Sequence, residues 1–372
     1  MIQMKMGGAE RLVYNLALKL DRRLFNPSVA WFYGDEILKE FYSLDIPLFH
    51  VYKTKRIDLR AMRALGKIIR DNNIHIVNAH HFMSLVYSFY GSKIVNQRKL
   101  IYTEHSEWEI ERIPWKWRSI GRRLLSRSDG AVGVSTAVSK RIQEAFQTIP
   151  SQTFSFQNGV EGEAFTGRAS RAEIRKSLDV AEQDIIIGTV ANFRKIKNHL
   201  FLLKAFSELV KTEKRVKLLL IGQGFESDTE NSEPAVRDFI NEMGLRSNVL
   251  TLGYRSDIPE LLNAMDIFCL TSFKEGLPIS LIEAMAAGLP VVGTNVEGVR
   301  EVIADDRNGF LVSISDAEGL KVALHKLAKD ESLRKKFGEE SKFLAKTAYS
   351  LKRCVNEHEG LFVSVMNQKP PL

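Results

Sequence analysis

Short apolar runs alternate with longer amphipathic stretches along most of this chain. The runs are rich in Val, Ile and Tyr and end in polar or small residues, which is typical of strands. The stretches between them have the spacing of apolar residues that helices show. This alternation predicts βαβ units, and therefore two parallel sheets that are covered by helices.

The apolar runs fall into two series. The predicted strands of the first series are 27–33, 74–80, 99–105 and 129–135. Those of the second series are 184–192, 216–222, 248–253, 266–272 and 289–294. The clearest predicted helices are 9–20, 59–72, 82–95, 136–147 and 280–287.

A break between the two series lies near QNGVEGEAF (157–165), where Asn158-Gly159 is a turn signal. A chain of 372 residues also suits two domains better than one. We predict an N-terminal domain over 1–165 and a C-terminal domain over 166–348. A last helix at about 349–368 is able to pack back on the N-terminal domain.

Composition narrows the class of protein. The 44% apolar and 26% charged content is that of a soluble globular protein. No window of about 18 apolar residues predicts a membrane-spanning helix, and the start of the chain lacks signal-peptide features. The two distant cysteines, Cys269 and Cys354, indicate a reducing compartment without a disulfide framework. These features predict a cytoplasmic protein.

The net charge of +8 is unevenly distributed. The first 165 residues hold 24 Lys and Arg against 16 Asp and Glu, whereas the rest holds 29 of each. Such a basic half favours an anionic partner, although a solvated basic surface explains the charge equally well. No nucleic-acid motif is present, so we do not expect nucleic acid as the partner.

The segment TSFKEGLPISLIEAMAAGLPVVGTNVEGVREVI (271–303) carries the most specific chemistry. After a predicted strand, Gly276–Pro278 forms a turn that leads into the helix 280–287, which the next glycine stops. Backbone N–H groups therefore gather at the carboxyl edge of a parallel sheet, where ligands bind. A nucleotide diphosphate suits these groups, and the carboxylates of Glu275 and Glu283 suit sugar and ribose hydroxyls.

At this point the sequence resembles the retaining glycosyltransferases of family 4 (glycosyl transferases group 1). Other parts of nearly the whole chain match the family in order: GGAERLVYNLALKL, IYTEHSE, VGVS, QNGVE and VANFRKIKNH. The resemblance implies an α/β protein of GT-B fold, with two Rossmann-like domains whose parallel sheets face across a cleft. It also implies a nucleotide-sugar donor on the C-terminal domain, with no cofactor and no catalytic metal.

The resemblance implies roles on the donor side. Glu275 accepts hydrogen bonds from the donor sugar and is a predicted catalytic residue, Glu283 holds the ribose, and Lys197 contacts the diphosphate. The family often has an arginine where this chain has Asn192, so we predict that Arg194 is the second phosphate ligand. Further predicted donor contacts are Gly7, Gly8, Gly276, Leu277, Pro278 and Ile279.

Blander interpretations of these residues remain open. The basic residues around Lys197 are also compatible with a solvated helix start that Asn198 caps. Glu283 is compatible with a surface position on an amphipathic helix. The GxG in IGQGF (221–225) lacks the third glycine of a dinucleotide site, so we interpret it as a strand-end turn.

Three histidines follow predicted strands of the N-terminal domain. By resemblance, His105 lines the cleft and is the second predicted catalytic residue, while His80 and His81 are acceptor-side candidates. Local backbone hydrogen bonds would equally explain a histidine at a strand end. We predict no metal site, because acidic ligands at zinc spacing are absent.

In the family, the glycine loop follows a full buried strand. Here Met1–Gln3 supplies only the last part of such a strand in front of Gly7-Gly8. We therefore expect the first strand to be truncated, and an apolar strand to precede Met1 in the full protein. The given chain should then be less stable than one with the complete strand.

The stretch PWKWRSIGRRLLSRS (114–128) is basic and carries two tryptophans. It suits an interfacial helix on anionic lipid, or a helix that packs on the sheet and solvates its basic face. The first interpretation would place the protein at the inner face of the cell membrane, with a lipid-linked acceptor.

We predict a retaining transferase that moves a sugar from a nucleotide sugar to an acceptor hydroxyl, in bacterial surface polysaccharide or glycolipid synthesis. The alternatives are a sugar-nucleotide epimerase of the same fold and a non-catalytic basic binding module.

Overall fold

A computed structural model describes residues 1, 7–34, 39–92, 98–165, 170–226 and 228–367. The chain divides into two compact units. Unit 1 comprises Met1–Asn158 and Leu351–Leu372, and unit 2 comprises Gly159–Ser350. The last helix, α15 (Leu351–Asn367), therefore belongs to unit 1.

Unit 2 is built on one sheet of six parallel strands, in the order β12-β11-β10-β7-β8-β9. All five predicted strands of the second series are present, and β12 is the strand that the hydrophobic pattern missed. The strands are β7 (Ile185–Val190), β8 (Val216–Ile221), β9 (Val249–Gly253), β10 (Ile267–Leu270), β11 (Val291–Thr294) and β12 (Gly309–Val312). Chain order and spatial order together give the doubly wound arrangement, in which the direction of winding reverses between β7 and β10.

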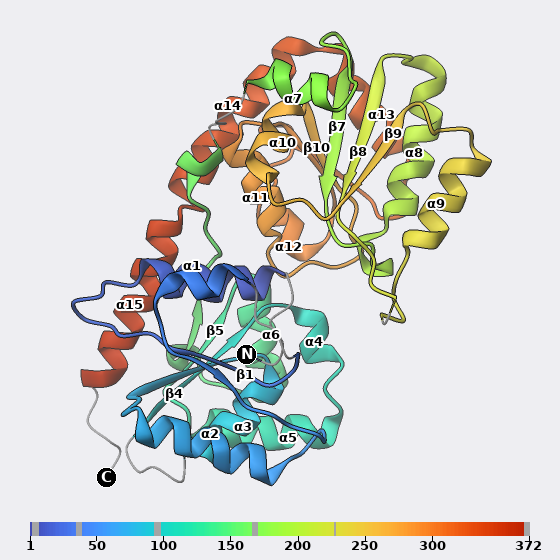
Figure 1. The fold of residues 1–372 in the computed structure, drawn as a ribbon. Helices are drawn as coiled ribbons and strands as arrows, with labels where there is room; N and C mark the ends of the chain where they lie inside the picture. Colours follow the sequence, from blue (N-terminus) through green and yellow to red (C-terminus); the bar gives the residue numbers. More distant parts are fainter. Residues whose placement is uncertain (2–6, 35–38, 93–97, 166–169, 227, 368–372) are drawn as a thin grey trace. The chain divides into compact units, whose positions relative to one another are not determined.

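Helices cover both faces of this sheet (Figure 1). One face carries α8 (His199–Thr212), α9 (Glu233–Glu242) and α13 (Ala317–Lys329). The other carries α10 (Ile258–Ala264), α11 (Ile279–Ala286) and α14 (Glu331–Thr347). Two shorter helices are α7 (Arg171–Ser177) and α12 (Glu297–Arg300). Because the strands are covered on both sides, they are almost wholly apolar, and their side chains form a buried core.

Unit 1 divides its strands between two parallel sheets. Four strands form the order β3-β4-β5-β6, and two short strands, β1 and β2, pair with each other. The strands are β1 (Val29–Trp31), β2 (Leu48–His50), β3 (Ile76–His80), β4 (Lys99–Glu104), β5 (Gly130–Gly133) and β6 (Thr153–Ser155). The hydrophobic pattern predicted β1 within 27–33 but missed β2 and β6, which are also three residues long.

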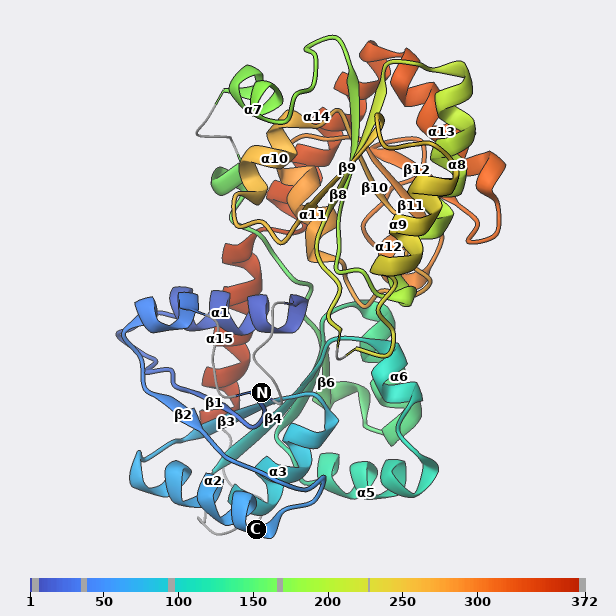
Figure 2. The ribbon, with the colours of Figure 1, turned by 45° about the vertical axis from the view of Figure 1, so that its right-hand side comes forward.

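The helices of unit 1 lie on both sides of these strands. Figures 1 and 2 show α2, α3 and α5 side by side, while α1 contacts α15. The helices are α1 (Gly8–Lys19), α2 (Leu59–Asp71), α3 (Phe82–Ser92), α4 (Glu107–Glu111), α5 (Trp115–Leu125) and α6 (Thr136–Phe146). Each predicted helix of this unit is present, with its ends within a few residues of the expected positions.

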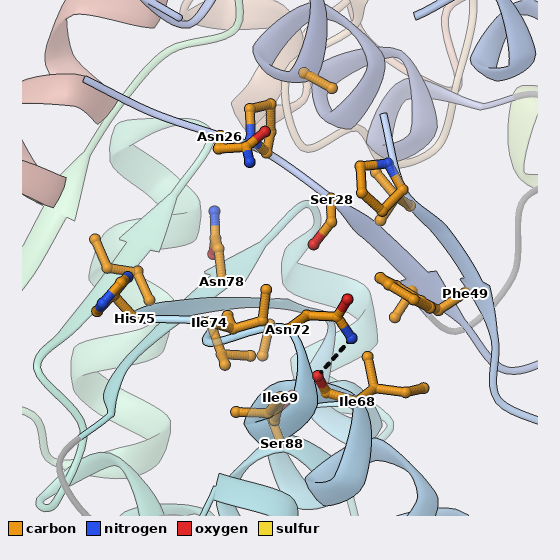
Figure 3. A pocket seen from close by; sticks show the side chains of 18 of the residues that line it. Asn26, Ser28, Phe49, Ile68, Ile69, Asn72, Ile74, His75, Asn78 and Ser88 are labelled. Atoms are coloured by element: carbon orange, nitrogen blue, oxygen red, sulfur yellow. Dashed lines mark hydrogen bonds between the residues drawn. The ribbon is translucent and has the colours of Figure 1, made fainter. Parts of the chain in front are cut away.

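A cavity of about 710 Å³ lies between the two sheets of unit 1 (Figure 3). Its walls include residues of β1 on one side and of β3 on the other. Side chains of α1 and α15 line it as well as side chains of α2 and α3, so both helix layers border it. Met1 lies at this cavity and its backbone nitrogen donates to Ala30 O at 2.8 Å. The rest of the predicted partial strand Met1–Gln3 lies outside the described residues.

Candidate functional site

In unit 2, the loops that follow β7 and β10 meet where the winding of the sheet reverses. Parallel strands end at one edge, so residues 191–198 and 271–278 emerge next to each other. Phe273 N donates to Ile196 O at 2.8 Å, and Thr271 Oγ1 donates to Asn198 O at 3.1 Å. These hydrogen bonds fix the two loops as one platform at the position where open α/β sheets bind ligands.

The predicted donor residues Lys197 and Glu275 come together on this platform. Lys197 Nζ lies 2.6 Å from Glu275 Oε1, which also accepts a hydrogen bond from Ser272 Oγ at 2.5 Å. The lysine side chain is 27% exposed and the glutamate side chain 9%. The site thus presents a cation and a fixed carboxylate, which can bind a phosphate and a hydroxyl group respectively.

The turn that follows Glu275 leads into α11. Gly276, Leu277 and Pro278 are buried, and Pro278 occupies the N-cap position of the helix. Ile279 and Glu283 are partly buried on α11. The first-turn N–H groups of α11 therefore begin directly at the platform, where they add to its affinity for anions.

A glycine of α12 packs closely against the turn that contains Glu275 and Gly276. A Cβ atom at Gly298 would lie 2.5 Å from the carbonyl oxygens of Glu275 and Gly276. A glycine is therefore required for this close approach of the first turn of α12. The position of Glu275 depends in this way on a residue 23 places further along the chain.

Arg194 pairs with an acidic residue of the segment between β8 and α9. Its Nε lies 2.8 Å from Asp228 Oδ2, and its backbone forms an isolated bridge with Asn231. The structure thus pairs Lys197 with Glu275, and Arg194 with the segment that follows β8. Its role as the second phosphate ligand stays a prediction.

His199 was not singled out in the sequence, although it adjoins the platform. It is the first residue of α8, it is buried, and its ring stacks on Phe193 with the centroids 4.6 Å apart. Burial, together with the charge of Lys197, lowers its pKa to about 4. Asn198, the cap in the alternative interpretation of this segment, occupies the N-cap position, but in a left-handed conformation without a side-chain hydrogen bond.

In unit 1, the three predicted histidines lie together at the carboxyl ends of β3 and β4. His80 Nδ1 lies 2.9 Å from His105 Nε2, and the two rings stack. His81 Nδ1 lies 2.9 Å from Glu104 Oε1. Glu104 is fully buried and was missed in the sequence, where it looked like the polar end of a strand. Its place between an apolar strand and His105 was the feature of the sequence that could have indicated a functional role.

The pKa values of the histidines in this cluster are shifted in opposite directions. Burial, followed by the charges of neighbouring groups, lowers the pKa values of His80 and His105 well below 6.5. Burial also acts to lower the pKa of His81, but the charge and hydrogen bond of Glu104, together with the charges of Glu109 and Glu10, outweigh it and raise this pKa. The cluster therefore combines two neutral rings with one ring that favours its charged form.

The glycine loop forms the start of α1. Gly7 is exposed and occupies the N-cap position in an extended conformation, and Gly8 is the first residue of the helix. Burial raises the pKa of Glu10, in the first turn, to about 7. Gly7 and Gly8 keep their predicted role in donor binding as a prediction. Among the described residues, no group of three or more His, Cys, Asp or Glu side chains could hold a metal ion.

Two family models match this chain, and they divide it as the two series of strands do. The model described as Glycosyltransferase Family 4 matches residues 6–163, and the one described as Glycosyl transferases group 1 matches residues 170–343. Together they account for most of the sequence.

Individual relatives agree with the family models. The chain is 24% identical, over 88% of its length and 84% of the relative, to N-acetyl-alpha-D-glucosaminyl L-malate synthase of Bacillus anthracis. It is 22% identical to UDP-Gal:alpha-D-GlcNAc-diphosphoundecaprenol alpha-1,3-galactosyltransferase of Escherichia coli, over 74% of this chain and 72% of the relative.

A solved structure agrees with the fold. Anabaena Alr3699/HepE, determined in complex with UDP-glucose, has a TM-score of 0.86 at 20% identity and covers 98% of both chains. The family models, the relatives and this likeness lead to one conclusion. The chain belongs to the family 4 glycosyltransferases, the glycosyl transferases of group 1, and has their GT-B fold of two α/β domains with parallel sheets.

Proposed function

We propose that this glycosyltransferase uses a nucleotide sugar as donor and transfers the sugar to an acceptor hydroxyl with retention of the anomeric configuration. The observation that carries the proposal is the pairing of Lys197 with Glu275 at the reversal point of the unit 2 sheet. A uridine diphosphate donor is the first candidate, because the Anabaena structure was determined with UDP-glucose and the Escherichia coli relative is named for UDP-Gal.

Different residues of the platform would bind different parts of the donor. Lys197 and the first N–H groups of α11 would stabilise the charge that develops on the leaving diphosphate. Glu275, which two donors already orient, would accept hydrogen bonds from the sugar, and Glu283 from the ribose. In the reaction, the bond from the sugar carbon to the phosphate oxygen breaks, and the bond to the acceptor oxygen forms on the same face. The leaving phosphate takes the acceptor proton.

Nucleotide binding tests the donor half of the proposal. In thermal unfolding with UDP, GDP and ADP, UDP should raise the melting temperature. At a hundredfold excess over Kd, ligand binding adds about 2.7 kcal/mol to the free energy of unfolding. A protein that none of the three stabilises would instead fit a non-catalytic binding module.

Transfer assays test the reaction itself. Lys197→Ala should lower kcat/KM by roughly 10²–10³-fold, because a charge on the leaving group is lost. Lys195→Ala is its matched control, since Lys195 is exposed in the same loop and should leave kcat/KM unchanged. Glu275→Gln should abolish transfer, whereas Glu242→Gln, at the exposed end of α9, should not.

The product decides between the remaining alternatives. An NMR spectrum of the product should show the anomeric configuration of the donor. An inverted product would contradict the retaining mechanism. A changed donor sugar in the absence of any acceptor would indicate an epimerase.

We also propose a lipid-linked acceptor in surface polysaccharide or glycolipid synthesis, at an anionic membrane surface. The Escherichia coli relative is named for a diphosphoundecaprenol acceptor. No helix among the described residues has the length and apolar character needed to span a membrane. The candidate contact is α5, where Leu124 and Leu125 are buried but Trp115 is 72% exposed. The exposed cations of α5 are Lys116, Arg122 and Arg123, and the exposed Arg127 follows shortly after the helix.

Vesicle binding tests this surface. The protein should sediment with phosphatidylcholine vesicles that contain phosphatidylglycerol, and binding should weaken when salt rises from about 0.1 M to about 1 M. Arg122→Glu with Arg123→Glu should abolish binding. Lys335→Glu with Lys336→Glu, on exposed positions of α14, should not. Binding that ignores both salt and the α5 charges would contradict the proposal.

A further inference from the structure

The Glu104 carboxylate of unit 1 is fully buried, and its two oxygens are held by three donors. Tyr102 OH donates to Oε2 at 2.6 Å, and the backbone N–H of His105 donates to Oε1 at 2.7 Å. His81 Nδ1 completes the set at 2.9 Å from Oε1. A buried carboxylate requires such partners, and here they leave it in one fixed position.

The His81 ring is correspondingly fixed at one end. Because Nδ1 faces Glu104, the other ring nitrogen, Nε2, lies on the opposite edge of the imidazole. The side chain is 25% exposed, so it is the part of the network that a bound molecule can reach. Among the described residues, Nε2 has no hydrogen-bond partner.

The backbone of His81 has an unusual conformation that keeps the ring there. Its φ is +68°, in the left-handed region that non-glycine residues rarely occupy. Its N–H donates to Thr103 O at 3.0 Å, which ties the residue to β4. Strain of this kind persists where the surrounding structure imposes it, and it is concentrated at functional sites.

The charged groups around His81 come from several elements. Three carboxylates raise its pKa: Glu104 of β4, Glu109 of α4 and Glu10 of α1. His80 and His105 also interact with His81 electrostatically, and burial and the charge on His81 contribute to keeping them neutral. Of the carboxylates, Glu104 is the one that makes a hydrogen bond to the ring.

We propose that Glu104 is a positioning residue that orients the His81 ring and favours its protonated form, so that Nε2–H donates a hydrogen bond to an oxygen of the acceptor substrate. The role of the ring in acceptor binding rests on the proposed function. The orientation and charge of the ring rest only on the network in unit 1. The two parts can therefore fail separately.

The direct test is the titration of His81 in the whole chain, followed by NMR of its ring C–H groups. Glu104→Gln should lower the pKa of His81 by at least one unit, about a tenfold change in its proton affinity. Glu144→Gln is the matched control, because it removes one negative charge from an exposed position of α6. It should leave the His81 titration unchanged. An unaltered His81 pKa in folded Glu104→Gln would overturn the proposal.

A second variant keeps the test decisive if Glu104→Gln fails to fold. Tyr102→Phe removes one hydrogen bond from the carboxylate and keeps its charge. It should loosen the His81 ring, seen as a broader or shifted ring resonance, while the retained carboxylate keeps the pKa of His81 raised. A ring resonance identical to that of the unmodified chain would count against the network.

Kinetics then test the role in substrate binding. His81→Phe should raise KM for the acceptor at least tenfold and leave KM for the donor unchanged. In Glu104→Gln, the fall of kcat/KM at alkaline pH should begin about one unit lower. If the titration changes as expected but acceptor KM does not, the positioning role stands and the acceptor role is wrong. If no transfer is found with any donor, the proposed function fails and the titration still decides the role of Glu104.

Discussion

Unit 1 and unit 2 share the same alternation of strands and helices, but their described strands are joined differently. In unit 2, six strands make one continuous sheet, and the reversal between β7 and β10 brings two loops into hydrogen-bonding contact. Among the described residues of unit 1, β1 and β2 form a sheet apart from the four-stranded one, and a cavity lies between β1 and β3. A βαβ pattern therefore predicts the layers of a domain, but not which of its strands join one sheet.

The charged groups of the two units also differ in burial and in the partners they contact. Lys197 and Glu275 in unit 2 neutralise each other at a partly exposed surface. Glu104 in unit 1 is fully buried and supports a histidine in its charged form. The ion pair of unit 2 suits a ligand that replaces each charged group as the partner of the other. The buried pair of unit 1 suits a histidine that donates a hydrogen bond from a fixed position.

The largest expected effect concerns the cavity between β1 and β3 of unit 1. A chain that carries five Val and Ile residues in front of Met1 should be more stable, because a strand could pair with both β1 and β3 and fill the cavity. Each buried side chain contributes roughly 1.5–3 kcal/mol, against about 1–2 kcal/mol for ordering the residue, so a few kcal/mol should remain.

The measurement is the melting temperature of unit 1, which should rise by several degrees. The extension also replaces a buried ammonium at Met1, whose pKa burial lowers to about 5, by a neutral amide. An extension of Gly and Ser of the same length is the control. Equal melting temperatures for the two extended chains would show that the cavity does not accept a strand.

A smaller effect is expected from the buried histidine of unit 2. Since the pKa of His199 falls from 6.5 to about 4 on folding, the unfolded chain binds more protons between these values. Stability should therefore decrease as pH falls from 6.5 towards 4, by up to about 3 kcal/mol from this group. His199→Gln should make the free energy of unfolding less dependent on pH over that range. Denaturant unfolding at several pH values measures this, and identical slopes would contradict the assignment.

The smallest effect compares helix caps in the two units. In unit 1, the Ser135 side chain accepts a hydrogen bond from Val138 N, so Ser135→Ala should cost about 1 kcal/mol. In unit 2, Asn198 makes no such bond and has a φ of +53°. Asn198→Gly should leave stability within about 0.5 kcal/mol, since glycine adopts this conformation readily. A large loss on Asn198→Gly in denaturant unfolding would restore the predicted capping role.

Much of unit 2 could be predicted from the sequence. Its strands are continuous apolar runs, and Lys197 and Glu275 each follow one of them, so the topology alone brings the two residues together. The exact partner of Arg194 could not be predicted, because Asp228 lies in a loop without periodicity. His199 was overlooked for a similar reason, since a histidine in an apolar helix resembles other core positions.

Unit 1 shows where the sequence is less informative. The three histidines were predicted from their places after β3 and β4, but their different charges depend on burial and on Glu104. The separation of β1 from β3 depends on which strand edges pair with each other. The hydrophobic pattern within a single strand does not predict its pairing partner.

The ion pair of the unit 2 platform has a consequence for competition between anions. An inorganic phosphate that took Lys197 would leave the nearly buried Glu275 carboxylate with a weaker set of partners. A phosphate joined to a polyol would bring hydroxyl groups that replace the lost partner. The platform would thereby discriminate against the simple anions that are abundant in solution, through the cost of separating its own charges.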